Sequence, residues 1–120
     1  MLRVVVVQGP PASGKTTLVR KLAADTGLGF LSKDSIKELF YDTLGTPVTR
    51  DESIAYGRAS IQGMVHMLEN LAGFDRTVFY EAALHPEVAS EEMGRLVREY
   101  GIRVMQIYCY ASAEELLYRF

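Results

Sequence analysis

Residues 9–16 constrain this chain more than any other stretch, because they spell Gly-Pro-Pro-Ala-Ser-Gly-Lys-Thr, a G-x-x-x-x-G-K-T pattern. The run from Val4 to Val7 just before it is entirely apolar, which favours a strand buried on both faces. Apolar residues at helical spacing follow between Leu18 and Ala23. A buried strand, a glycine-rich loop and a helix in this order predict a loop that binds the phosphates of a nucleoside triphosphate.

The residue types of the loop suit that task. Gly9 and Gly14 can adopt backbone angles closed to other residues, so that N–H groups turn toward a polyphosphate. Lys15, which we expect to be exposed, places its charge against the β- and γ-phosphates, and the Thr16 hydroxyl can bind Mg²⁺. The helix that begins near Lys15 directs its positive end at the same anion. The residues expected to bind ATP are Gly9, Ala12, Ser13, Gly14, Lys15, Thr16 and Thr17.

A glycine-rich turn that binds nothing is the alternative interpretation of residues 9–16. A shorter pattern such as G-x-G-x-x-G would leave that alternative open. The full pattern, placed directly between a buried strand and a helix, argues against it.

Composition limits the class of protein. A chain of 120 residues makes one domain, and a net charge of −2 gives no broad basic surface for extended nucleic acid. The single cysteine, Cys109, excludes an internal disulfide and suits a reducing cytosol. The N-terminal apolar run is too short for a signal peptide or a membrane span, so we expect a cytoplasmic protein.

Strand and helix patterns alternate along the chain. We expect strands near residues 3–8, 28–32, 77–81 and 102–110, and helices near 15–26, 51–72 and 86–100. A further helix is expected to start at the capping box Ser35-x-x-Glu38. This alternation predicts an α/β fold, with a parallel sheet between two layers of helices. The carboxyl ends of the strands then share one edge, which makes the phosphate loop, Lys33-Asp34 and Glu81 the candidates for chemistry.

Three stretches resemble the P-loop kinases of the polynucleotide-kinase and zeta-toxin type, which are AAA-like P-loop phosphotransferases. They are residues 9–17, the sequence Leu-Ser-Lys-Asp-Ser-Ile-Lys-Glu at 31–38, and Tyr-Gly-Arg-Ala-Ser at 56–60. The resemblance covers nearly the whole chain and implies a P-loop NTPase fold with strand order 2-3-1-4-5. Relatives continue into a fifth strand and an arginine-bearing lid, so we expect residues 1–120 to be a kinase domain that is incomplete at its C-terminus.

The resemblance also implies roles for two acidic residues. In such kinases an acidic residue after the second strand is the base for an acceptor hydroxyl, and Asp34 matches that position. An acidic residue that ends the third strand supports the metal or the substrate, and Glu81 stands there, although many relatives have aspartate. The chain is thus expected to use ATP and Mg²⁺, with Thr16 and Glu81 as metal-binding candidates and Lys15 and Asp34 as catalytic ones.

Asp34 and Arg58 each have a competing structural interpretation. Asp34 stands beside a helix start, where aspartate is a common cap, although Ser35 with Glu38 could satisfy that helix start unaided. Arg58 lies between Ile54 and Ile61 on the apolar stripe of the long helix. Its stem could pack there while its charge reaches water, or its guanidinium could grip a phosphate or carboxylate of the acceptor in the cleft.

Two functions remain open at this point. The first is an ATP-dependent phosphotransferase whose acceptor is a small alcohol, a sugar nucleotide or a nucleic-acid 5′-hydroxyl. The second is a nucleotide-dependent switch with little or no transfer activity, although these 120 residues contain no N-K-x-D or T-K-x-D guanine motif. Without a fifth strand the fourth would be an apolar sheet edge, so we also expect self-association through residues 102–109.

Overall fold

The computed structural model of the protein describes residues 1–10, 14–82 and 86–109. The predicted nucleotide-binding residues Ala12 and Ser13 lie outside these ranges. The elements in chain order are β1 (Leu2–Gln8), α1 (Lys15–Thr26), β2 (Phe30–Ser32), α2 (Lys33–Leu44), α3 (Arg50–Leu71), β3 (Arg76–Ala82), α4 (Pro86–Tyr100) and β4 (Arg103–Tyr108).

The strands form one parallel sheet in the order β2-β3-β1-β4, which confirms the predicted sheet and the order of its first four strands. The register places Val7 of β1 opposite both Glu81 of β3 and Ile107 of β4. Ser32 of β2 lies on the other side of Glu81. These residues make one row across the sheet close to its carboxyl edge, so the segments that follow them all start from the same side of the molecule.

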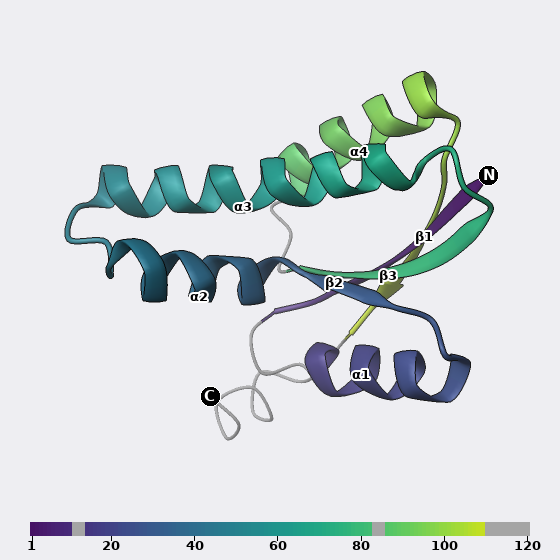
Figure 1. Ribbon diagram of the computed structural model, residues 1–120, viewed down its shortest axis with the longest axis horizontal. Coiled ribbons are helices and arrows are strands. Elements are labelled where there is room, and N and C mark those ends of the chain that lie inside the picture. The colour runs from purple at the N-terminus through teal and green to yellow at the C-terminus, as the bar shows by residue number, and fades with distance from the viewer. Residues whose placement is uncertain (11–13, 83–85, 110–120) are drawn as a thin grey trace.

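Helices cover both faces of the sheet, with α3 and α4 on one side and α1 on the other (Figure 1). Successive residues of β1 serve opposite faces. Leu2, Val4 and Val6 pack against residues of α3 and α4, whereas Val7 packs with Val19 of α1. Because a fully buried branched side chain stabilises the fold by about 1.5–3 kcal/mol, the all-apolar β1 anchors the phosphate loop that follows it.

The second strand is shorter than predicted. Residues 28–32 were expected to form it, but the structure has only Phe30–Ser32 in β2. The backbone N–H of Phe79 still donates to the carbonyl of Gly29 over 3.1 Å, and pairing with β3 ends there. β2 lies at the end of the sheet with β3 as its single neighbour, so nothing holds Leu28 in an extended ladder.

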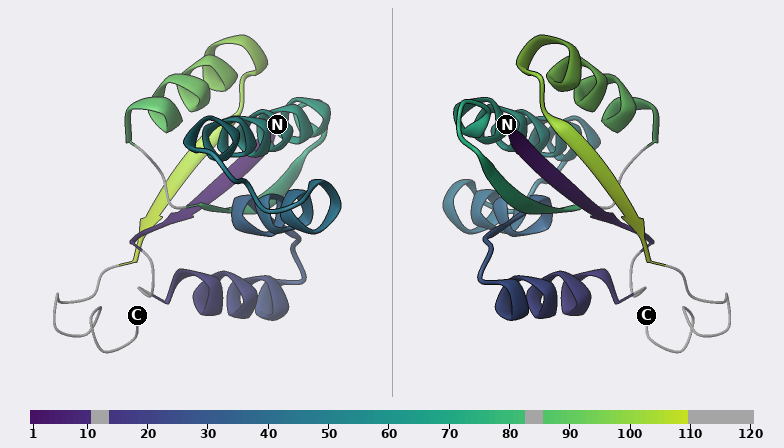
Figure 2. Two further views of the ribbon diagram at one scale, coloured as in Figure 1. Left: turned by 90° about the vertical axis from the view of Figure 1, so that its left-hand side faces the viewer. Right: turned by 90° about the vertical axis from the view of Figure 1, so that its right-hand side faces the viewer.

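α2 and α3 form a helical hairpin that extends beyond the sheet (Figures 1 and 2). Tyr56 of α3 packs against the rings of Phe40 and Tyr41 of α2, and its hydroxyl donates to the carbonyl of Gly45 over 2.9 Å. Ile54, predicted to join the buried stripe of α3, is 45% exposed, since buried positions on this helix begin only at Ser60. None of the helices in the described ranges combines the length and the apolar character needed to cross a bilayer.

Candidate active site

The phosphate loop leads from the central strand into α1. Gly14 ends it with φ of +89°, a left-handed conformation that favours glycine, as predicted. Gly9 is buried but has no positive φ, so the special angle expected there is absent. No side chain of the described residues caps α1, and therefore its first N–H groups remain available for an anion.

Lys15 is buried, with 6% of its surface exposed, and the expectation of an exposed lysine was wrong. Its Nζ donates a hydrogen bond over 3.1 Å to the carbonyl of Gly9, six positions earlier. The side chain thus folds back across the loop instead of extending into solvent. This contact holds the ammonium group between the end of β1 and the start of α1, where it can meet a bound phosphate.

Glu81 reaches the phosphate loop from the neighbouring strand. It is 2% exposed, and its Oε1 accepts a hydrogen bond from the Thr16 hydroxyl. A buried carboxylate is costly without such a partner, so this bond stabilises Glu81 where it is. The pair places a hydroxyl and a carboxylate oxygen together beside the loop, and oxygen donors of these two kinds are what Mg²⁺ prefers. Thr16 and Glu81 therefore fit a magnesium ion.

Asp34 lies in the first turn of α2 and is exposed. The predicted capping box at Ser35 was wrong, since the helix begins at Lys33 and its N-cap is Ser32, whose side chain accepts from the N–H of Ser35 over 3.3 Å. β2 passes into α2 without an intervening loop, so the helix start lies earlier in the chain than predicted, with its cap at Ser32 instead of Ser35. Because Ser32 is the cap, Asp34 does not serve as one, and the competing interpretation of this residue falls away.

Arg58 is exposed on α3 and forms no hydrogen bond or ion pair with any residue that the structure describes. Four of the predicted positions are thus joined in two hydrogen-bonded pairs, Lys15 with Gly9 and Thr16 with Glu81. Asp34 shares their edge of the sheet through the register of Ser32 with Glu81. Arg58 is not brought into contact with them, and its role in acceptor binding stays a prediction.

Two further residues lie at this edge: Lys33, named with Asp34 among the candidates for chemistry but given no role of its own, and Cys109, which was not a candidate. Lys33 is half-buried, and burial lowers the pKa of its ammonium group, as do the charges of Lys37 and Lys15, while Asp34 opposes them. Cys109 is 8% exposed and sits just past β4, with its N–H donating to the carbonyl of Gln8 over 2.7 Å. Burial raises the pKa of its thiol, Lys15 lowers it and Glu81 raises it, so both charges act on Cys109.

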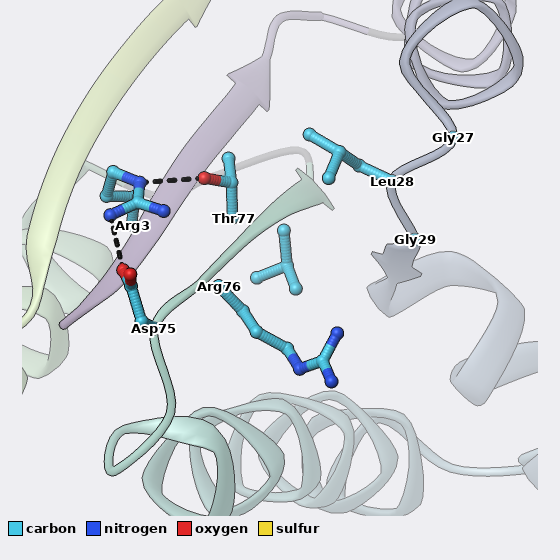
Figure 3. A pocket seen from close by; sticks show the side chains of 8 residues that line it. Arg3, Gly27, Leu28, Gly29, Asp75, Arg76 and Thr77 are labelled. Atoms are coloured by element: carbon cyan, nitrogen blue, oxygen red, sulfur yellow. Dashed lines mark hydrogen bonds and ion pairs between the residues drawn. The ribbon is translucent and has the colours of Figure 1, made fainter.

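A separate hollow of about 280 Å³ lies at the opposite edge of the sheet, where β3 begins (Figure 3). Figure 3 shows Arg3 between Asp75 and Thr77, and its guanidinium donates to each of them over 2.8 Å. The Arg3 charge is thus neutralised by Asp75. None of the described residues of the phosphate loop lines this hollow, and the loop follows the other end of the strands.

Nearly the whole chain matches a known protein family. The sequence profile of the AAA domain family matches residues 4–120. The chain belongs to this family. A solved structure of a candidate kinase from Chloroflexus aurantiacus superposes with a TM-score of 0.89 at 32% identity, over 98% of this chain and 64% of the other. The fold is accordingly that of a P-loop kinase.

Two further relatives of this AAA domain are named as kinases. A cytidylate kinase from Ignicoccus hospitalis is 43% identical over 44 residues, which are 37% of this chain and 26% of that protein. A shikimate kinase from Acinetobacter baumannii has a TM-score of 0.57 at 20% identity, over 99% of this chain and 62% of the other, and shows likeness of fold. The chain therefore spans less than two thirds of the length of each of these relatives.

Proposed function

We propose that this AAA domain is an ATP-dependent phosphotransferase, which moves the γ-phosphate of ATP to a hydroxyl acceptor. The observation that carries the proposal is the bond between Thr16 of the phosphate loop and Glu81 at the carboxyl end of β3. It joins the phosphate loop, which follows β1, to an acidic group on the neighbouring strand β3. The next strand along, β2, is followed by Asp34. Nucleotide and acceptor would meet across that row.

The nucleotide half of the site uses backbone and cationic groups. The N–H groups of the loop and of the first turn of α1 would bind the phosphates, and Lys15 would neutralise charge on the transferring group. Thr16 and Glu81 would hold Mg²⁺, which supplies positive charge against the phosphate oxygens when bound. The Thr16 hydroxyl now donates its hydrogen bond to Glu81. When Mg²⁺ binds, the Thr16 oxygen and the Glu81 carboxylate would both be available to the ion.

The acceptor half is assigned to Asp34 and Arg58. Asp34 would accept the proton of the attacking hydroxyl as the general base. Its exposure supports this role, and so does Ser32 as the cap of α2, because the Asp34 carboxylate is not needed to cap the helix. Arg58 would bind an anionic group of the acceptor from α3.

The acceptor belongs to a broad class in this proposal: a small alcohol, a sugar nucleotide or a nucleic-acid 5′-hydroxyl. The name of one similar structure, shikimate kinase, supports a small hydroxyl compound. The likeness to polynucleotide kinases and zeta toxins rests on residues 31–38 and 56–60 and remains part of the proposal. A net charge of −2 weighs against extended nucleic acid.

Two properties of the whole protein accompany the proposal. A cytoplasmic location fits the buried free thiol of Cys109, which a reducing compartment preserves. Self-association through β4 fits its place at the end of the sheet, where Met105 and Tyr108 are 64% and 65% exposed.

A transfer assay tests the function. The protein is incubated with Mg²⁺ and ATP labelled in its γ-phosphate, in the presence of representatives of each acceptor class, and the products are separated. A kinase places the label on one class of acceptor. Release of label only as inorganic phosphate, with every acceptor tested, would favour the switch and contradict the proposed function.

A further inference from the structure

Lys33 stands at the point where β2 passes into α2. It follows Ser32, which lies opposite Glu81 in the sheet, and it precedes the proposed base Asp34. Its side chain is half-buried, and the charge of Lys15 reaches it from the phosphate loop. Lys33 therefore belongs to the same cluster of charged groups as Lys15 and Asp34.

Lys33 lacks a partner for its charge. In the described part of the chain it forms no ion pair, whereas Arg95, another cation that is partly covered, is bonded to carboxylates. Burial lowers the pKa of Lys33, and so do the charges of two neighbouring lysines. The charge of Asp34 raises this pKa, but the net shift is downward. A half-buried ammonium group without a bonded anion is costly, and such groups gather at binding sites.

Lys37, one helical turn further on, differs from Lys33 in this respect. Its Nζ lies 6.0 Å from the centre of the Tyr41 ring, which provides a cation–π contact. Lys37 therefore has a partner within α2 and adds positive potential beside Lys33. The group with an unsatisfied charge is Lys33.

Two anions could satisfy Lys33: a phosphate of the nucleotide, or a charged group of the acceptor. The phosphate loop follows β1, and β3 separates β1 from β2. With about 4.8 Å between strands, Lys33 starts roughly 10 Å across the edge from the nucleotide's strand. Lys15 and the start of α1 already serve the phosphates, whereas Lys33 adjoins Asp34 on the acceptor's side.

We propose that Lys33 binds an anionic group of the acceptor, a carboxylate or a phosphate, and so selects hydroxyl compounds that carry a negative charge. This inference rests on the proposed function, because it takes the bound compound to be the acceptor of the phosphate. The binding step itself requires no transfer of phosphate and can be measured without it.

Binding is tested by the protection of lysine side chains from limited acetylation, measured for each lysine by peptide mass spectrometry. The protein is treated with Mg²⁺ and a non-hydrolysable ATP analogue, then with matched probes: gluconate against sorbitol, and glycerol 3-phosphate against glycerol. We expect an anionic probe to protect Lys33 and its neutral counterpart to leave it reactive. Lys21, exposed on α1, is the internal control and should not change. Protection by the nucleotide analogue alone, or protection by neither anion, overturns the inference.

Transfer kinetics distinguish this inference from the proposed function. In Lys33→Gln the preference of kcat/KM for the charged member of a pair should fall about 10- to 100-fold, as for one lost hydrogen bond to a charged group. The KM for Mg-ATP should stay as in wild type and in Lys21→Gln. Unchanged preference in Lys33→Gln contradicts the role of Lys33, whereas protection of Lys33 without any transfer contradicts only the kinase activity.

Discussion

The hydroxyl of Thr16 donates a hydrogen bond to the carboxylate of Glu81, a residue 65 positions further along the chain. Thr16 is in the first turn of α1 and Glu81 near the end of β3, so the bond ties a helix start to the strand beside the one that feeds it. The two oxygens face one another next to Lys15, which makes this pair the proposed place for Mg²⁺.

Replacing Glu81 by glutamine tests the metal site. The amide oxygen can still accept from Thr16, but the charge that would attract Mg²⁺ is gone. We expect the affinity for ATP in the presence of Mg²⁺ to fall about 10- to 100-fold, the range typical when a group that supports a metal is removed. Calorimetric titration with and without Mg²⁺ measures it, and Glu91→Gln on the exposed face of α4 is the control. Equal losses with and without Mg²⁺ would point to a structural role for Glu81.

Replacing Lys15 by alanine tests nucleotide binding. We expect ATP affinity to fall by at least about tenfold, because a charge-assisted hydrogen bond worth about 1.5–3 kcal/mol is lost. Lys15 is buried and bonded to Gly9, so circular dichroism must show that the fold survives. Lys21→Ala, on the exposed side of the same helix, should bind ATP as wild type does. Equal affinity in a folded Lys15→Ala protein refutes the phosphate loop.

The β4 edge predicts self-association. Met105 is 64% exposed on the last strand of the described sheet, and open apolar edges pair with other chains. Light scattering should show a mass that rises with protein concentration, and Met105→Lys should reduce it. Val97→Lys, at a position of α4 that is 43% exposed, should leave it unchanged. A constant monomer mass at high concentration contradicts this expectation.

Cys109 should react slowly with thiol reagents. Its thiol is buried, and burial raises its pKa, so less of the reactive thiolate exists at a given pH. The rate of reaction with a disulfide reagent should be lower in the native protein than in the unfolded chain, and should increase with pH. A native rate equal to that of the unfolded chain would show that Cys109 is open to solvent.

The sequence predicted the sheet well because strands depend on strong local patterns. The apolar run of β1 shows its burial within a few neighbouring residues. The strand order came from the family resemblance and was confirmed. Ile54 was misjudged because helical spacing says which face is apolar and not how far the helix extends beyond the sheet.

The site was harder to predict, since its contacts join distant parts of the chain. Nothing in the local sequence shows that Lys15 folds back to Gly9 or that Glu81 accepts from Thr16. The start of α2 was misplaced because Ser35-x-x-Glu38 is a good capping box in isolation. Asp34, an acidic residue suited to a first helical turn, was the available signal that the helix begins earlier, at Lys33.

The central claim is that phosphate passes from the loop to a hydroxyl beside Asp34, and single-turnover transfer with Asp34→Asn tests it most directly. Asparagine keeps the size and polarity of the side chain but cannot accept the proton. With the acceptor found in the transfer assay, the rate should fall roughly 10²- to 10⁴-fold while Mg-ATP affinity stays the same. Transfer by the variant at close to the wild-type rate would contradict the account, and the base would then have to be sought first at Glu81.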